Sequence, residues 1–114
     1  MFAACAPVVV EGPPPPPPRA VVVAGVPPIH VRLASYGPNC GVPRGNASER
    51  VAQLCDGRSE CVFRADNAQF GDPAVGCPKA FDVEFECAGQ RRMSRTPPRA
   101  VRAGEEYRIE LSCR

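Results

Sequence analysis

Seven cysteines in a chain of 114 residues are the side chains with the clearest chemistry. Their density in so small a chain predicts disulfide bonds and an oxidising compartment. Zinc binding is the competing use of cysteine, and structural zinc sites need two close cysteine pairs. Here the closest pair, Cys55 and Cys61, has five residues between its members and there is no second pair. We therefore expect disulfides and no metal site.

The pairing of the cysteines is only partly suggested by the sequence. Cys55 and Cys61 would close a small loop. Cys87 and Cys113 each end an alternating segment on its apolar face, so a bond between them would hold the last strand to the sheet. Six cysteines allow many pairings, and the sequence alone does not choose among them. Besides Cys5, which precedes the expected fold, the cysteines are Cys40, Cys55, Cys61, Cys77, Cys87 and Cys113, so that Cys40 would be left with Cys77.

Side chains suited to catalysis are sparse. An enzyme needs a nucleophile with a base, or a pair of carboxylates. His30 has no evident serine or cysteine partner. Asp82, Glu84 and Glu86 share one face of an alternating segment, where a glycosidase pair could stand, but an acidic solvent face is the ordinary result of alternation. We expect no catalytic residues and no enzyme activity.

Basic residues offer a second chemistry, the binding of anions. Lys79 is the single lysine among 14 basic residues. The net charge of +2 is too small to indicate nucleic acid or a membrane surface as partner. A basic stretch without interleaved aromatic residues predicts a loop that could touch phosphate or an anionic polysaccharide rather than a nucleic-acid domain. It consists of Arg91, Arg92, Arg95, Arg99 and Arg102.

Alternating apolar residues predict the strands that must position these groups. In the segment 29–34, Ile29, Val31 and Leu33 are expected to face the core, and Ala34 to lie on the outer face. The expected strands are 20–24, 29–34, 61–65, 81–87 and 107–113.

One helix is predicted before Asp56. Asn46 is expected to cap it, with Glu49 three residues later in a variant of the capping box. Apolar residues from Val51 to Cys55 lie on one face at helical spacing. Several strands with one or two short helices indicate a small, disulfide-stapled α+β domain with antiparallel strands.

The length suits one domain. Residues 1–19, an apolar start followed by six prolines, are expected to be a disordered linker, because proline runs form stiff polyproline II spacers. An SH3-type ligand is the alternative interpretation of the proline run. The folded domain is expected over 20–114, with no stretch approaching the ~20 apolar residues of a membrane span.

Four segments between Ile29 and Cys87 have an order and spacing that resemble one family. They are Tyr36-Gly37, Cys55-x-Gly57-x-x-x-Cys61-Val62, Ala65-x-Asn67-x-x-Phe70-Gly71-Asp72-Pro73-x-x-Gly76-x-x-Lys79 and Val83-x-Phe85-x-Cys87. This pattern is similar to the SUEL-type lectins, the rhamnose- and galactose-binding domains of fish and sea-urchin egg lectins, over roughly half the chain. The resemblance implies a compact α+β domain with antiparallel strands and two short helices, and it supports the pair Cys55–Cys61. The composition makes this a bacterial-looking variant.

The resemblance also implies a function and its residues. The function would be non-catalytic binding of a monosaccharide at a shallow surface site, without metal or cofactor. The sugar-facing residues would be Tyr36, Asp72, Gly76 and Lys79. Lys79 would donate hydrogen bonds and Asp72 would accept them. Gly76 would let the backbone approach the sugar, and Tyr36 would offer a ring face and a hydroxyl.

The chain departs from the family pattern. The cysteine of the family's Asp-Pro-Cys is displaced here to Cys77. The family partner of Cys87 lies in an N-terminal strand, where this chain has no cysteine, and Cys113 would substitute from the other end. The family also has a glutamate near that strand, whereas Glu11 is the only acidic residue before Tyr36. The rival is therefore a structural or protein-interaction module that keeps the fold without sugar binding.

The expected setting follows from these interpretations. Disulfides indicate a secreted, periplasmic or cell-surface location. A single sugar-binding domain is expected to bind its carbohydrate partner weakly, and avidity would come from repeats or assembly into a larger or multivalent protein. The proline spacer is consistent with a domain displayed away from something else.

Overall fold

The computed structural model describes residues 25–102 and 105–114. The expected strand 20–24, the linker and Cys5 lie outside the described residues. The small α+β domain with antiparallel strands is confirmed. Its elements in chain order are β1 (Ile29–Tyr36), a 3-10 helix (Pro38–Cys40), α1 (Ser48–Cys55), β2 (Glu60–Ala65), α2 (Asn67–Phe70), β3 (Phe81–Cys87), β4 (Gln90–Arg95) and β5 (Tyr107–Ser112).

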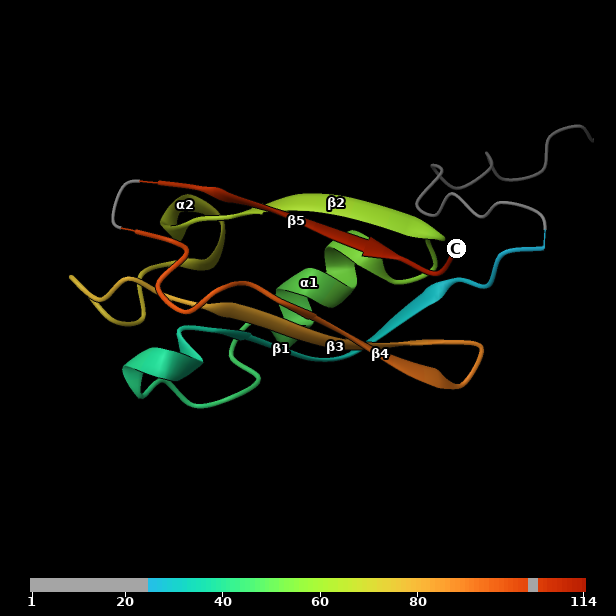
Figure 1. Cartoon of the computed structure of the whole chain (residues 1–114), viewed down its shortest axis with the longest axis horizontal. Coiled ribbons are helices and arrows are strands. Elements are labelled where there is room, and N and C mark those ends of the chain that lie inside the picture. Colours follow the sequence, from blue (N-terminus) through green and yellow to red (C-terminus); the bar gives the residue numbers. More distant parts are fainter. Residues whose placement is uncertain (1–24, 103–104) are drawn as a thin grey trace, which may run out of the picture.

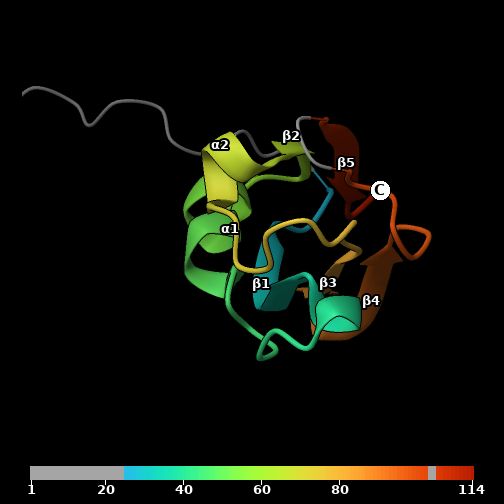
Figure 2. The ribbon, with the colours of Figure 1, turned by 90° about the vertical axis from the view of Figure 1, so that its left-hand side faces the viewer.

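Two antiparallel sheets form the body of the domain. One has the order β1-β3-β4 and the other pairs β2 with β5. Figure 1 shows the two sheets as separate layers, and Figure 2 shows α1 and α2 together along one side of them. The core fills the space between the layers, because the buried apolar residues of every strand except β4 belong to one cluster; these include Val31, Phe63, Phe81, Phe85 and Ile109.

The alternation predicted for β1 is right in its first half and wrong in its second. The register of β1 against β3 shifts between Val31 and Leu33, which marks a β-bulge. After the bulge Ala34 is buried and Leu33 is only half-buried. A bulge adds one residue to a strand, so the side chains beyond it change faces. Tyr36 consequently points into the core instead of toward solvent.

The prediction that Asn46 caps α1 is wrong. The residue before the helix is Ala47, and no side chain caps it. Asn46 binds the backbone of Tyr36 instead: its Oδ1 accepts from the Tyr36 N–H at 2.8 Å and its Nδ2 donates to the Tyr36 carbonyl at 2.9 Å. Ser48 similarly accepts from the N–H of Ala34 at 2.9 Å. These side chains satisfy the outer edge of β1, where a neighbouring strand would otherwise pair.

The basic stretch is not a single loop, because Arg91, Arg92 and Arg95 lie on β4. A two-residue turn folds the chain back after β3, and β4 then pairs along it with Arg91 opposite Glu86. The Arg91 guanidinium lies 3.3 Å from the Glu84 carboxylate. The acidic face of β3 is therefore partly neutralised by its neighbouring strand.

We expect Ala88→Asn to stabilise the domain. Ala88 and Gly89, the two turn residues between β3 and β4, have φ angles of 52° and 82°. Such a two-residue hairpin turn favours Asn-Gly, and a residue other than glycine or asparagine is strained there. The substitution should raise the free energy of unfolding by ~0.5–1 kcal/mol in urea titrations. Ala88→Val should lower it, since a branched side chain suits a positive φ less well. A loss of stability in Ala88→Asn would contradict the assigned turn.

Three disulfides tie the elements together. One joins the 3-10 helix to the loop before β3, one joins the end of α1 to β2, and one joins the end of β3 to the residue after β5. The pairs are Cys40–Cys77, Cys55–Cys61 and Cys87–Cys113. They are the pairs that the sequence suggested.

Candidate functional site

The four residues singled out from the sequence come from two parts of the chain. Tyr36 ends β1, and Lys79 forms an isolated antiparallel bridge with Val101 just before β3. Asp72 and Gly76 lie in the loop between α2 and β3. The structure brings Lys79 next to the side chains of Asp72 and Tyr36. Its Nζ is 2.6 Å from Asp72 Oδ1 and 5.4 Å from the centre of the Tyr36 ring.

The ammonium of Lys79 is nearly enclosed. Its side chain is 2% exposed, whereas that of Asp72 is 30% exposed. Besides Asp72, the ammonium donates to the carbonyl of Cys77 at 3.2 Å. An ammonium has three donors, and two of them have acceptors here on the inner side of the loop, so the ammonium holds the Asp72 carboxylate in place. The outward part of the site is therefore the Asp72 carboxylate and the exposed Gly76 backbone.

Tyr36 is fully buried. Its ring packs on Phe70 and Phe81, with ring centres 5.9 and 5.5 Å away. Its hydroxyl donates to Asn67 Oδ1 at 2.6 Å. In this conformation the ring supports Lys79 from the inner side and offers no open face to a ligand.

The loop that carries the site is held by contacts that the sequence analysis did not identify. Asn39 donates from Nδ2 to the Pro78 carbonyl at 3.0 Å, and its Oδ1 accepts from the Ala80 N–H at 2.8 Å. Gly37 has a φ of 88°, and a Cβ there would lie 3.2 Å from Val42 and 3.5 Å from the stem of Lys79. The Tyr36-Gly37 pair thus places a residue without a side chain where the lysine stem passes.

Burial is the main cause that raises the pKa of Tyr36 to about 12, followed by the negative charges of Asp72 and Asp66. A free tyrosine has a pKa of ~10. The folded state therefore holds this proton more tightly than the unfolded chain. The resulting stabilisation is complete below pH ~10 and is lost as the pH rises toward 12.

The raised pKa of Tyr36 predicts that this ring ionises at a higher pH than a free tyrosine. The chain has two tyrosines, and Tyr107→Phe leaves Tyr36 alone. In that variant the near-ultraviolet phenolate band should appear with a midpoint of about 12. Circular dichroism recorded in parallel tells ionisation from unfolding. A midpoint near ~10 in a protein that is still folded would contradict the buried placement of the ring.

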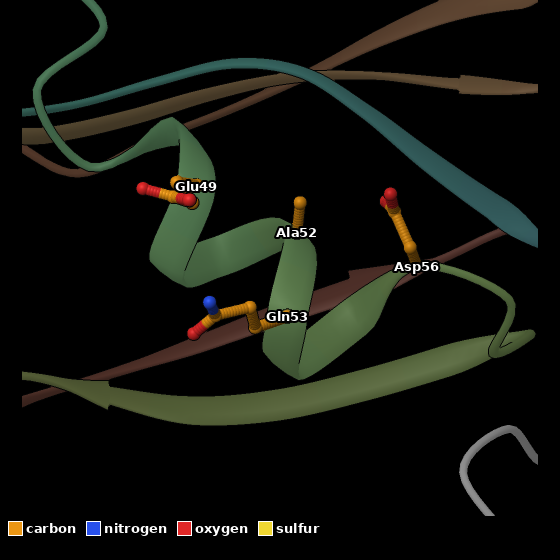
Figure 3. A pocket seen from close by; sticks show the side chains of 4 residues that line it. All are labelled: Glu49, Ala52, Gln53 and Asp56. Carbon is orange, nitrogen blue, oxygen red and sulfur yellow. The ribbon is translucent and has the colours of Figure 1, made fainter.

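A cavity on the outer side of α1 is separate from these residues. It has a volume of about 570 Å³ and is lined by Glu49, Ala52, Gln53 and Asp56, all from the helix or the residue that follows it (Figure 3). The Asp56 carboxylate is engaged, since Oδ1 accepts from the Val31 N–H at 2.7 Å. We assign this cavity no part in the site.

Three known proteins that resemble parts of this chain are lectins. An L-rhamnose-binding lectin of Scomberomorus niphonius is 40% identical over 42 residues, which are 37% of this chain and 21% of that lectin. An L-rhamnose-binding lectin of Echinometra lucunter is 34% identical over 50 residues, 44% of this chain and 48% of that lectin. A D-galactoside-specific lectin of Heliocidaris crassispina is 37% identical over 43 residues, 38% and 41% of the two chains.

The chain is a partial homologue of rhamnose-binding and galactoside-specific lectins. The matched segments span less than half the length of each of these relatives. No family model matches the chain, and no solved structure matches it. In the described part of the chain, none of the helices is both long enough and apolar enough to span a membrane.

The lectin resemblance implies a glutamate from an N-terminal strand, and the described structure has two glutamates near Asn67 that come from the other end of the chain. Glu105 and Glu106, just before β5, line a cavity of about 520 Å³ together with Asn67. Asn67 is the partner of the Tyr36 hydroxyl. Glu106 lies 3.4 Å from Arg64, whereas no ion pair of Glu105 is found among the described residues. The disulfide partner of Cys87, Cys113, likewise comes from the C-terminal part of the chain.

Proposed function

We propose that this chain is a non-catalytic carbohydrate-binding module that recognises a monosaccharide such as rhamnose or galactose. The observation that carries the proposal is the Lys79–Asp72 pair, at 2.6 Å in the loop that also carries the exposed Gly76. A sugar presents hydroxyls that donate hydrogen bonds, and this pair presents a partly exposed carboxylate acceptor that the buried ammonium fixes in place. The partial homology with lectins supports the same assignment.

Each residue has its own part in this proposal. Asp72 accepts from a sugar hydroxyl through its exposed side, and Lys79 fixes that carboxylate from behind through the contact at 2.6 Å. Gly76 lets the sugar approach the loop backbone, since nothing lies within 4 Å of the place where its Cβ would be. Tyr36 forms the inner support of the ammonium.

The proposed setting is an oxidising one, secreted, periplasmic or at the cell surface, because three disulfides tie this small fold together. One shallow site binds weakly, so useful avidity requires several copies of the domain or a larger assembly. Enzyme activity and nucleic-acid binding form no part of the proposal.

The test is a calorimetric titration of the oxidised chain with L-rhamnose and D-galactose. Saturable heat with either sugar, and none with a sugar of different hydroxyl arrangement such as D-glucose, is the expected result. Absence of heat with both sugars would overturn the proposal.

The second candidate function is a structural or protein-interaction module that keeps the fold without binding sugar. The observation that favours it is the burial of Tyr36 and Lys79, which leaves only Asp72 and Gly76 outward. This alternative predicts that substitutions at Asp72 change stability but have no sugar binding to remove.

A further inference from the structure

Arg99 belongs to the basic stretch. Unlike Arg91, which lies on β4 and pairs with Glu84, it does not lie on a strand. It lies in the segment between β4 and β5 and is exposed. Its guanidinium forms no ion pair with any of the residues that the structure describes. The anion-binding chemistry that the sequence indicated for this stretch is therefore available at Arg99.

The backbone of Arg99 is strained. Its φ is 70°, in the left-handed region that favours glycine. It sits in a turn in which the Ala100 N–H donates to the Pro97 carbonyl at 3.1 Å. Directly after the turn, Val101 and Lys79 exchange two backbone hydrogen bonds of 2.8 and 2.9 Å, which fix the turn next to the candidate site. Strain of this kind persists where the surroundings impose it, and such positions concentrate at ligand sites.

A cavity lined by Arg99 borders the candidate sugar site at Gly76. Its volume is about 510 Å³, within the range of small-ligand pockets. Among the described residues that line the cavity, Arg99 has a positive charge and none has a carboxylate. Gly76 is shared by the cavity and the candidate site. The lining residues are Asn39, Gly76, Cys77, Pro78, Pro98 and Arg99.

We propose that this cavity is a second subsite for an acidic sugar residue linked to the neutral monosaccharide, with Arg99 binding its carboxylate or sulfate. The inference rests on the proposed sugar-binding function. A sugar held at Asp72 and Gly76 places its linked neighbour over the cavity. A guanidinium binds a carboxylate or a sulfate through two parallel N–H donors. The ligand class is thus an anionic glycan, and this explains an arginine at a position where glycine would be less strained.

The test compares matched acidic and neutral glycans by calorimetry. An alternating L-rhamnose–D-galacturonic acid oligosaccharide should bind about tenfold more tightly than its carboxyl-reduced form, and added salt should diminish this preference. A sulfated galactan oligosaccharide and its desulfated form provide the sulfate arm, so the two arms show which anion is preferred. Arg99→Gly should remove the preference, leave binding of the neutral form unchanged and raise the midpoint of unfolding, since glycine relieves the strained φ.

The control is Arg95→Gln, which removes the same charge from an exposed position on β4 outside the cavity. It should leave the acidic preference intact. Equal binding of acidic and neutral forms, or a preference that Arg99→Gly leaves unchanged, would overturn the subsite while the monosaccharide site stands. Failure of every sugar to bind would overturn the subsite and the proposed function together.

Discussion

Lys79→Met should abolish measurable binding of L-rhamnose and D-galactose to a domain that is still folded. Methionine keeps the unbranched stem that passes Gly37 and removes the ammonium. A hydrogen bond to a charged group contributes ~1.5–3 kcal/mol, which corresponds to ~10–100-fold in Kd. Asp72 loses the partner at 2.6 Å that fixes it for its hydrogen bond to the sugar. For a weak single site, loss of that hydrogen bond places the Kd beyond the range of a calorimetric titration.

The fold should survive this change at a moderate cost. The Asp72 side chain is 30% exposed, so water replaces the ammonium around its carboxylate. Loss of the ammonium from a pair whose carboxylate still reaches solvent is expected to cost ~1–3 kcal/mol, less than for a fully buried pair. Lys79→Ala should lose binding equally but unfold more easily, because it also removes the stem.

The matched control removes one cation from an ion pair elsewhere. Arg32 lies 3.7 Å from Glu86 on the outer face of the β1-β3-β4 sheet, and Arg32→Met should leave sugar binding unchanged. Near-ultraviolet circular dichroism reports whether each variant is folded. Unchanged affinity in a folded Lys79→Met protein would keep sugar binding but remove Lys79 from the site.

The parts of the fold that the sequence predicts well are those governed by local pattern. The alternation in 81–87 gave β3 with its bounds, and the alternation from Tyr107 onward gave β5. The sequence did not predict β4, because its residues show no apolar alternation. It is an edge strand with no fully buried residue. The faces predicted for the second half of β1 were wrong, because the bulge arises from the pairing with β3 and no pattern within β1 reveals it.

The lectin-like spacing singles out the candidate site as a set of residues and does not give their environment. It points to Asp72, Gly76 and Lys79, of which the structure brings Asp72 and Lys79 into contact and places Gly76 in the same loop. Lys79 pairs through its backbone with Val101, which is remote in sequence, and no local pattern reveals this bridge. Glu105, which lines a cavity with Asn67, comes from the same distant part of the chain, so the spacing of the motif does not point to it. Asn67, in contrast, lies within the lectin-like motif, so the sequence already contained the residue that holds the Tyr36 hydroxyl.

Removing the disulfide Cys87–Cys113 should destabilise the domain more than removing Cys55–Cys61. The first closes a loop with a sequence separation of 26 and the second a loop of only 6. Loop-closure entropy in the unfolded chain then predicts losses of ~3–4 and ~2 kcal/mol for the double alanine variants. Because small domains are stable by only ~5–15 kcal/mol, the larger loss is a substantial part of the total.

The comparison is a fair one because all four of these cysteines are buried, so each double variant removes the same buried groups. The bond Cys87–Cys113 also joins the two sheets, which the Arg92 guanidinium otherwise bridges by donating to the Ser112 carbonyl at 3.0 Å. Guanidinium chloride unfolding of both variants measures the difference. Equal losses would show that loop length does not govern the effect. Sugar binding should persist in both folded variants, because the site loop is tied by Cys40–Cys77.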